Sequence, residues 1–148
     1  MQDVEVLFRN IRDIRREITI LRKHEHELRE SMLPSAIRYD KDSVSSSPQD
    51  PMSKYAEKIS DTEEIIKKRL LKLQRDEYIA QKVLDDMPTS KYRTLLFLRY
   101  IDGGTNYQNS WAKVAQNVGY DEQYVRQKMH QKALSEAQII YKKIKKIH

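Results

Sequence analysis

The sequence predicts an all-α protein, with long N-terminal coiled-coil helices followed by a small, basic helical domain. Charged residues make up 34% of the 148 residues, and the chain has three glycines and four prolines, a composition that favours long helices. Apolar residues recur at steps of three and four along much of the chain, as they do on amphipathic helices. Prolines and serines gather between these periodic segments and mark where one helix should end and the next begin.

The first periodic segment, residues 1–33, predicts a long helix over about residues 2–33. Its apolar residues alternate steps of three and four, with one break at Glu25: Val4, Leu7, Ile11, Ile14, Ile18, Leu21, Leu28 and Met32. This spacing is a heptad seam of the kind found in coiled coils. Polar residues fill the other faces, so the seam needs a partner helix.

A Pro- and Ser-rich linker, residues 34–50, separates this helix from a second one over residues 51–87. Apolar residues recur every seven positions in the second helix: Met52, Ile59, Ile66, Leu73, Ala80 and Met87. The two seams can pair as an antiparallel hairpin within one chain, or they can pair between chains, because a heptad pattern does not record which chain supplies the partner. We place the hairpin slightly ahead, with self-association, preferably as a dimer, through any remaining apolar face.

Pro88 ends the second helix and opens a C-terminal domain, residues 88–148. A helix should begin there, with Thr89 or Ser90 as its N-cap. The domain holds eleven Lys and Arg against four Asp and Glu, a net charge of +7, whereas residues 1–87 hold seventeen against eighteen, a net charge of −1. Positive charge confined to one domain indicates a polyanionic partner for that domain.

The stretch VAQNVGYDEQYVRQ, residues 114–127, has the spacing of a helix-turn-helix. Such a motif needs a small residue where its helices cross, then a residue that tolerates positive φ in the turn, then an apolar anchor on the second helix. Ala115, Gly119 and Val125 meet these needs in order, and Asp121 is placed to cap the second helix. The expected core of the motif is Trp111, Val114, Ala115, Gly119, Val125 and Met129.

With Val125 and Met129 turned inward, helical geometry predicts an outward polar stripe on the second helix. The expected base-reading residues are Glu122, Gln123, Arg126, Gln127 and His130, and the expected contacts to the DNA backbone are Lys113, Tyr124, Lys128 and Lys132. Side chains of these types bind base edges and phosphates. A polar helix face is ordinary by itself, but with the motif spacing and the +7 charge it predicts sequence-specific binding of double-stranded DNA.

The apolar spacing continues to the C-terminus, through Ala133, Ala137, Ile140, Ile144 and Ile147. The second helix of the motif is therefore expected to run on, either covering the core of its own domain or dimerising. A basic amphipathic helix can also lie on a membrane surface, but that alternative is remote.

Two groups of residues carry a resemblance to known families. YRTLLFLRYI followed by SWAKVAQNVGYDEQYVRQKMHQKAL resembles region 4 of bacterial sigma factors. From about Leu33 to Leu134, the chain resembles phage-encoded regulators of late transcription of the RinA and ArpU type, through YDKDSVSSS, Arg99-Tyr100, Ser110-Trp111 and His130 to Leu134. The resemblance implies an activator of phage late genes that binds promoter or operator DNA in a bacterial host. It also raises bacterial RNA polymerase as a second candidate partner.

Two other functions fit the same pattern. The chain could be a coiled-coil adaptor whose sigma-like domain contacts RNA polymerase or another protein without binding DNA. It could instead be a small terminase-like DNA-packaging protein, which would assemble as a larger ring.

Enzymatic and metal-dependent functions find no support in the sequence, so we expect no cofactor, no metal site and no catalysis. The chain has no cysteine, and His24 and His26 lie two positions apart, on different helix faces, whereas a zinc-binding pair needs a spacing of four. No apolar run is long enough to span a membrane, and the N-terminus has no signal-peptide pattern, so we expect a cytoplasmic protein.

Overall fold

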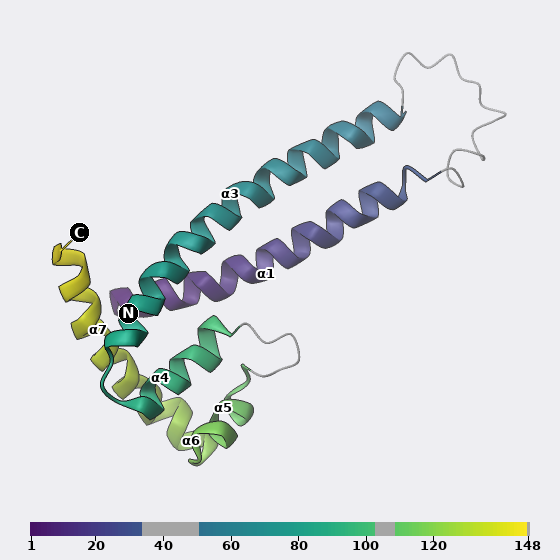
Figure 1. Ribbon diagram of the computed structural model, residues 1–148. Coiled ribbons are helices and arrows are strands. Elements are labelled where there is room, and N and C mark those ends of the chain that lie inside the picture. The colour runs from purple at the N-terminus through teal and green to yellow at the C-terminus, as the bar shows by residue number, and fades with distance from the viewer. Residues whose placement is uncertain (34–50, 103–108, 148) are drawn as a thin grey trace. The chain divides into compact units, whose positions relative to one another are not determined.

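The computed structural model describes residues 1–33, 51–102 and 109–147 (Figure 1). Its elements in chain order are α1 (Asp3–Glu30), α3 (Pro51–Asp86), α4 (Ser90–Leu96), η2 (Phe97–Ile101), α5 (Trp111–Val118), α6 (Glu122–Tyr124), η3 (Val125–Met129) and α7 (His130–Ile147). No strand occurs in these three ranges, and the expected all-α class is confirmed. The expected linker, residues 34–50 with YDKDSVSSS, lies outside the described residues, as do residues 103–108.

Both long helices occupy nearly the positions that the apolar periodicity predicted. The helix expected over residues 2–33 is α1, and the helix expected over residues 51–87 is α3. The chain divides into two compact units, which we call the terminal unit (Met1–Arg15 with Leu73–His148) and the middle unit (Arg16–Lys72). Their boundaries fall inside α1 and α3.

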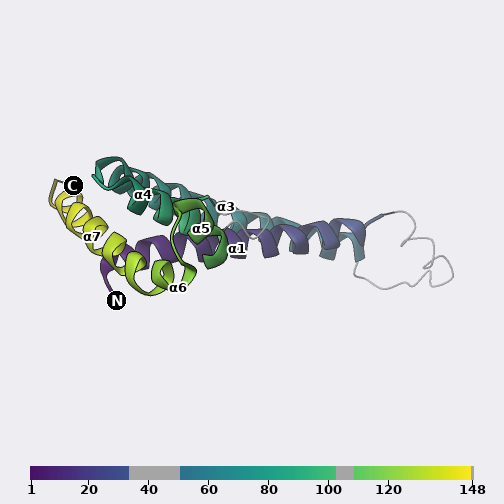
Figure 2. The ribbon, with the colours of Figure 1, turned by 90° about the horizontal axis from the view of Figure 1, so that it is seen from below.

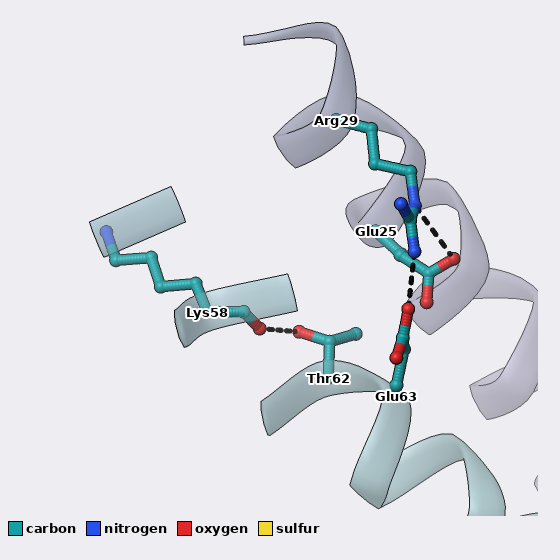
Figure 3. Close-up of polar contacts among 5 residues, drawn as sticks. All are labelled: Glu25, Arg29, Lys58, Thr62 and Glu63. Carbon is teal, nitrogen blue, oxygen red and sulfur yellow. Dashed lines mark hydrogen bonds and ion pairs between the residues drawn. The ribbon is translucent and has the colours of Figure 1, made fainter. Parts of the chain in front are cut away.

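In the middle unit, ion pairs join α1 to α3 in antiparallel order. Early in this part of α1, Glu17 Oε1 lies 2.7 Å from Arg69 Nε. Further along α1, Arg29 pairs with Glu63, which comes before Arg69 in α3 (Figure 3). Arg29 Nε also lies 3.6 Å from Glu25 Oε1, one turn back in its own helix (Figure 3). Exposed pairs of this kind contribute at most about 1 kcal/mol each, so they favour the antiparallel orientation more than they add to stability.

The buried faces of the two helices follow the heptad pattern read from the sequence. The buried seam residues are Val4, Leu7, Ile11, Ile14, Ile18 and Leu28 in α1, and Ile59, Ile66, Leu73 and Ala80 in α3, with Met87 just beyond its end. Thr62 and Asp76 are also buried, at positions between those apolar residues that the sequence analysis did not assign. Thr62 donates its hydroxyl hydrogen bond to the carbonyl of Lys58, one turn earlier, at 2.8 Å (Figure 3). The buried hydroxyl is therefore satisfied within its own helix and does not need a partner across the seam.

In the terminal unit, α4 lies against α5 and α7 (Figure 2). Thr89 occupies the N-cap position of α4, as one of two residues expected there, but its side chain makes no capping bond. Its hydroxyl instead donates to Glu136 Oε2 of α7 at 2.7 Å, and its N–H donates to Glu136 Oε1 at 3.1 Å. The start of α4 is therefore fixed to α7 by both oxygens of one carboxylate.

The first turns of α1 belong to the same core. The N–H of Val4 donates to Gln138 Oε1 of α7 at 2.9 Å. Phe8 is fully buried, and its ring centroid lies 5.6 Å from that of Tyr100. The N-terminal residues thus complete the core of the basic C-terminal region.

Two turns of the terminal unit are wider than α-helical turns. In η2, the N–H of Asp102 donates to the carbonyl of Phe97, five residues back, at 2.8 Å. In η3, the N–H of His130 donates in the same way to the carbonyl of Val125. Such π-helical turns are rare and occur frequently at functional sites. Each adds one residue to a turn and so rotates the residues that follow it.

Candidate nucleic-acid interface

The expected turn between two helices is formed by α5, Gly119 to Asp121, and α6. Ser110 caps α5 by accepting from the N–H of Lys113 at 3.2 Å, as one of the two residues expected there. Gly119 ends α5 with φ of 82°, a left-handed conformation that costs a residue with a Cβ about 1–2 kcal/mol. Asp121 Oδ2 then accepts from the N–H groups of Gln123 at 3.1 Å and Tyr124 at 3.3 Å. The positive φ at Gly119 and the cap at Asp121 are both confirmed.

Removing this cap should lower stability without disturbing the core. Asp121→Ala is expected to reduce the free energy of unfolding by about 1 kcal/mol, because two backbone N–H groups at the start of α6 lose their acceptor. Asp121→Asn keeps an acceptor oxygen and should lose much less. Urea unfolding of both variants measures the difference. Equal losses would instead assign the effect to the negative charge at the helix N-terminus.

Four of the six residues expected in the core of the motif are buried, whereas Gly119 is exposed because it forms the turn. Val114, Val125 and Met129 have no exposed surface, and Ala115 is 4% exposed. Trp111 is half-buried, and the guanidinium of Arg99 lies 4.3 Å from its ring centroid. Val114 and Ala115 of α5 and Val125 and Met129 of η3 belong to elements that lie against each other, so both helices contribute buried side chains to one core.

The outer side of the second helix carries the expected polar stripe, with one exception. Glu122, Gln123, Arg126 and Gln127 are all exposed. Of the residues expected at the DNA backbone, Lys113, Lys128 and Lys132 are exposed, and Tyr124 is half-buried.

The exception is His130, for which the expected outward position is wrong. His130 is 4% exposed, and its Nε2 lies 2.7 Å from the hydroxyl oxygen of Tyr100, a buried hydrogen bond. The cause is the π-helical turn η3, in which the backbone bonds to the fifth residue instead of the fourth. The additional residue brings His130 round to the face of Val125, whereas regular α-helical geometry turns it away.

The burial of His130 changes its chemistry. Loss of water around the imidazole lowers the pKa of His130 from 6.5 to about 4. Arg99, Arg9 and Arg12 lower this pKa further, and Glu5 opposes them. His130 is therefore neutral at pH 7, and with Tyr100 it forms a buried polar link between η2 and the start of α7.

Aromatic and basic side chains form a cluster beside the turn, which we call the Tyr-Lys cluster (Lys91, Tyr120, Tyr124 and Lys132). The rings of Tyr120 and Tyr124 lie 5.8 Å apart. Lys91 Nζ donates to the Tyr120 hydroxyl at 3.2 Å, and this bond raises the pKa of Lys91. Lys132 Nζ lies 3.5 Å from the Tyr124 hydroxyl. Lys91 and Tyr120 were not among the residues predicted from the sequence, because Lys91 belongs to α4 and meets the turn only in the folded chain.

Within residues 1–33, 51–102 and 109–147, no three His, Asp or Glu side chains gather closely enough to hold a metal ion. None of the described helices has the length and apolar character needed to cross a membrane.

No protein-family model, curated protein or solved structure matches this chain.

Proposed function

We propose that the chain is a DNA-binding transcriptional regulator that reads duplex DNA with the exposed face of α6 and η3. The observation that carries the proposal is the exposed set Glu122, Gln123, Arg126 and Gln127 on the helical segment that begins at the capping Asp121. An α-helix fits the major groove, where Arg and Gln can make paired hydrogen bonds to guanine and adenine. The opposite face of this helix is buried, so the motif presents its polar residues on a rigid support.

The surroundings of this face suit a polyanion. Residues 88–148 carry a net charge of +7. Lys128 and Lys132 lie on the same helical segment as the reading face, and Lys113 lies on α5, all three exposed. Lys and Tyr side chains commonly bind phosphate oxygens, and such contacts set the orientation of a protein on the duplex.

Selection of the full chain on a random duplex library tests the proposal. At about 150 mM salt, nonspecific binding is weak, so an enriched sequence motif is expected if α6 and η3 read bases. Recovery of no motif, together with weak salt-sensitive binding or none, would contradict it. That outcome would favour an adaptor that contacts RNA polymerase or another protein.

The Tyr-Lys cluster should contribute to affinity without contributing to sequence choice. Lys91→Gln is expected to weaken binding about equally on all duplexes and to reduce the slope of log affinity against log salt by about 1, because one phosphate contact is lost. Lys67→Gln, an exposed lysine of the middle unit, is the matched control and should change neither. Affinity measured over a salt series checks both variants. If Lys91→Gln weakened binding only to duplexes that contain the selected motif, Lys91 would not be a phosphate contact.

The resemblance to phage regulators of the RinA and ArpU type directs the proposal to a particular class of promoter. We propose that the chain activates phage or prophage late genes, with bacterial RNA polymerase as a candidate partner. A reporter driven by promoters that contain the selected motif measures activation, and repression of the reporter would contradict it.

We also propose that the chain dimerises through apolar residues of the middle unit. Ile20, Ile65 and Leu71 are exposed there, while the seam residues Ile18 and Ile66 are already buried within the chain. Sedimentation equilibrium should show a dimer that the double variant Ile20→Lys with Leu71→Lys converts to a monomer.

A dimer would place two DNA-reading helices on one duplex. Its two half-sites should then lie about 34 Å apart, or a multiple of that distance, and a footprint that covers one half-site only would count against the dimer.

A further inference from the structure

A groove in the terminal unit lies outside the proposed DNA-reading face. It is formed by α3 and α7, has a volume of about 590 Å³, and is lined by Arg75, Tyr78, Ile79, Lys82, Tyr141, Ile144 and Lys145. Its apolar part comes from two tyrosines and two isoleucines, and its charged part from one arginine and two lysines. Such a combination of apolar surface and a few charged groups is typical of a binding site.

The apolar residues on one face of α7 are buried in its first turns and become exposed towards its C-terminal end. Ala133 and Ala137 have no exposed surface and Tyr141 is 8% exposed, but Ile144 is half-buried and Ile147 is 79% exposed. On α3, Tyr78 is 62% exposed. The core thus ends near Tyr141, while apolar side chains of both helices continue beyond it.

The charged side chains that line the groove are all positive. Lys82 Nζ lies 4.7 Å from the ring centroid of Tyr78, and Lys145 Nζ lies 5.1 Å from that of Tyr141. Each ammonium group is therefore placed over an aromatic ring of the groove. The carboxylates of Asp85 and Asp86 do not line this groove, but they line a neighbouring hollow that shares Lys82 and Ile144 with it.

These charges decide between candidate occupants. The last turns of α7 carry Lys142, Lys143, Lys145 and Lys146, so the same helix of a second copy would bring further positive charge to a positive rim. The phosphates of a nucleic acid could pair with the lysines, but they have no apolar surface to pack against the isoleucines. An amphipathic helix with an apolar face and flanking carboxylates satisfies both, in the way that helices commonly bind in grooves.

We propose that the groove between α3 and α7 binds an acidic amphipathic helix of a partner protein. The apolar face of that helix lies on Tyr78, Ile79 and Ile144, and its carboxylates pair with Arg75, Lys82 and Lys145. The proposal does not depend on DNA binding, because the groove shares no residue with the exposed stripe of α6 and η3.

The test uses the isotope-labelled full chain and two synthetic helical peptides of about 18 residues. Both peptides carry leucines at helical spacing. One has glutamates at all other positions, and its twin has lysines. The glutamate peptide is expected to shift the NMR signals of Ile79, Tyr141 and Ile144, and the lysine peptide is expected not to bind.

Reversing the rim charges makes the test sharper. The double variant Lys82→Glu with Lys145→Glu should weaken the glutamate peptide about tenfold, the effect of turning two partly exposed attractions into repulsions. The same variant should gain binding of the lysine peptide. Lys67→Glu with Lys68→Glu reverses two exposed charges of the middle unit and serves as the matched control, which should behave as the parent chain.

Three results would overturn the proposal. The first is equal binding of both peptides, or of neither. The second is a set of shifted signals at Gln123 and Arg126 instead of the groove, which would identify a general polyanion surface. The third is self-association that Tyr78→Asp abolishes, which would assign the groove to a second copy of the chain.

Discussion

Lowering the pH from 7 to 4 should reduce the free energy of unfolding of the terminal unit by about 3 kcal/mol through His130 alone. In the folded chain, burial lowers the pKa of His130 to about 4, while in the unfolded chain it returns to the ordinary value of 6.5. Between pH 4 and pH 6.5, His130 therefore binds a proton in the unfolded chain but not in the folded chain. The contribution of His130 to the free energy of unfolding is therefore fully present above pH 6.5 and is lost as the pH falls to 4.

The measurement must separate His130 from the carboxylates that also titrate near pH 4. Denaturant unfolding of the parent chain and of His130→Gln, at a series of pH values, gives this separation by difference. Glutamine can still donate to Tyr100 but does not titrate, so the difference between the two curves should shrink as the pH falls from 6.5 to 4. Parallel curves over this range would show that His130 is exposed to solvent in the folded chain.

Arg126→Ala should cost about 1–3 kcal/mol of binding free energy on the selected duplex motif, and much less on unrelated duplexes. Arg126 is exposed on η3, one turn after Gln123 and beside Gln127. A guanidinium can form two parallel hydrogen bonds with the O6 and N7 atoms of guanine, and the loss of such a pair relaxes the choice of base at that position. Competition binding with duplexes that carry each of the four bases at each position of the motif measures the change in base preference.

Arg126→Lys separates the two ways in which this residue can act. Lysine keeps the positive charge but not the planar fork that makes paired bonds. If Arg126 reads a base, the lysine variant should keep most of its nonspecific affinity and lose discrimination. If both variants lose the same affinity on every sequence, Arg126 contacts phosphate and the base-reading role is wrong.

The helices and the turn were predictable because their signals are local. The apolar spacing placed α1 and α3 within a few residues, and the left-handed Gly119 and the capping Asp121 were recognisable from their residue types and offsets. Each of these features depends on neighbours within about one helical turn, so a sequence pattern contains the necessary information.

His130 was misplaced because its orientation depends on a π-helical turn. Nothing in the segment Val125–Met129 distinguishes a π-helical from an α-helical turn by residue type. The wider turn is accompanied by packing that it makes possible, in which His130 meets Tyr100 at 2.7 Å and Trp111 at a ring-centroid distance of 4.8 Å. These partners lie far apart in the sequence, so the periodicity of the helix alone could not reveal the contact.

The share of α1 in the C-terminal core, and the part of Lys91 and Tyr120 in the Tyr-Lys cluster, were missed for a related reason. A heptad seam shows which residues will be buried but not what buries them. Phe8 meets Tyr100, and Lys91 meets Tyr120, only because the fold brings distant segments together. Burial was thus easier to predict than the identity of the contacting residues.

The π-helical turn η3 also determines how far two surfaces are rotated from each other about the axis of one continuous helical segment. These surfaces are the polar stripe and the α7 side of the groove. The polar stripe at Glu122 to Gln127 precedes or lies within this turn, and the α7 side of the groove follows it. An α-helix turns by about 100° per residue, so deleting one residue from η3 would rotate everything after it by about that angle relative to the stripe. A one-residue deletion there would redirect the inward face of α7 while leaving the sequence of both surfaces intact. The length of η3, and not only its composition, is therefore under structural constraint.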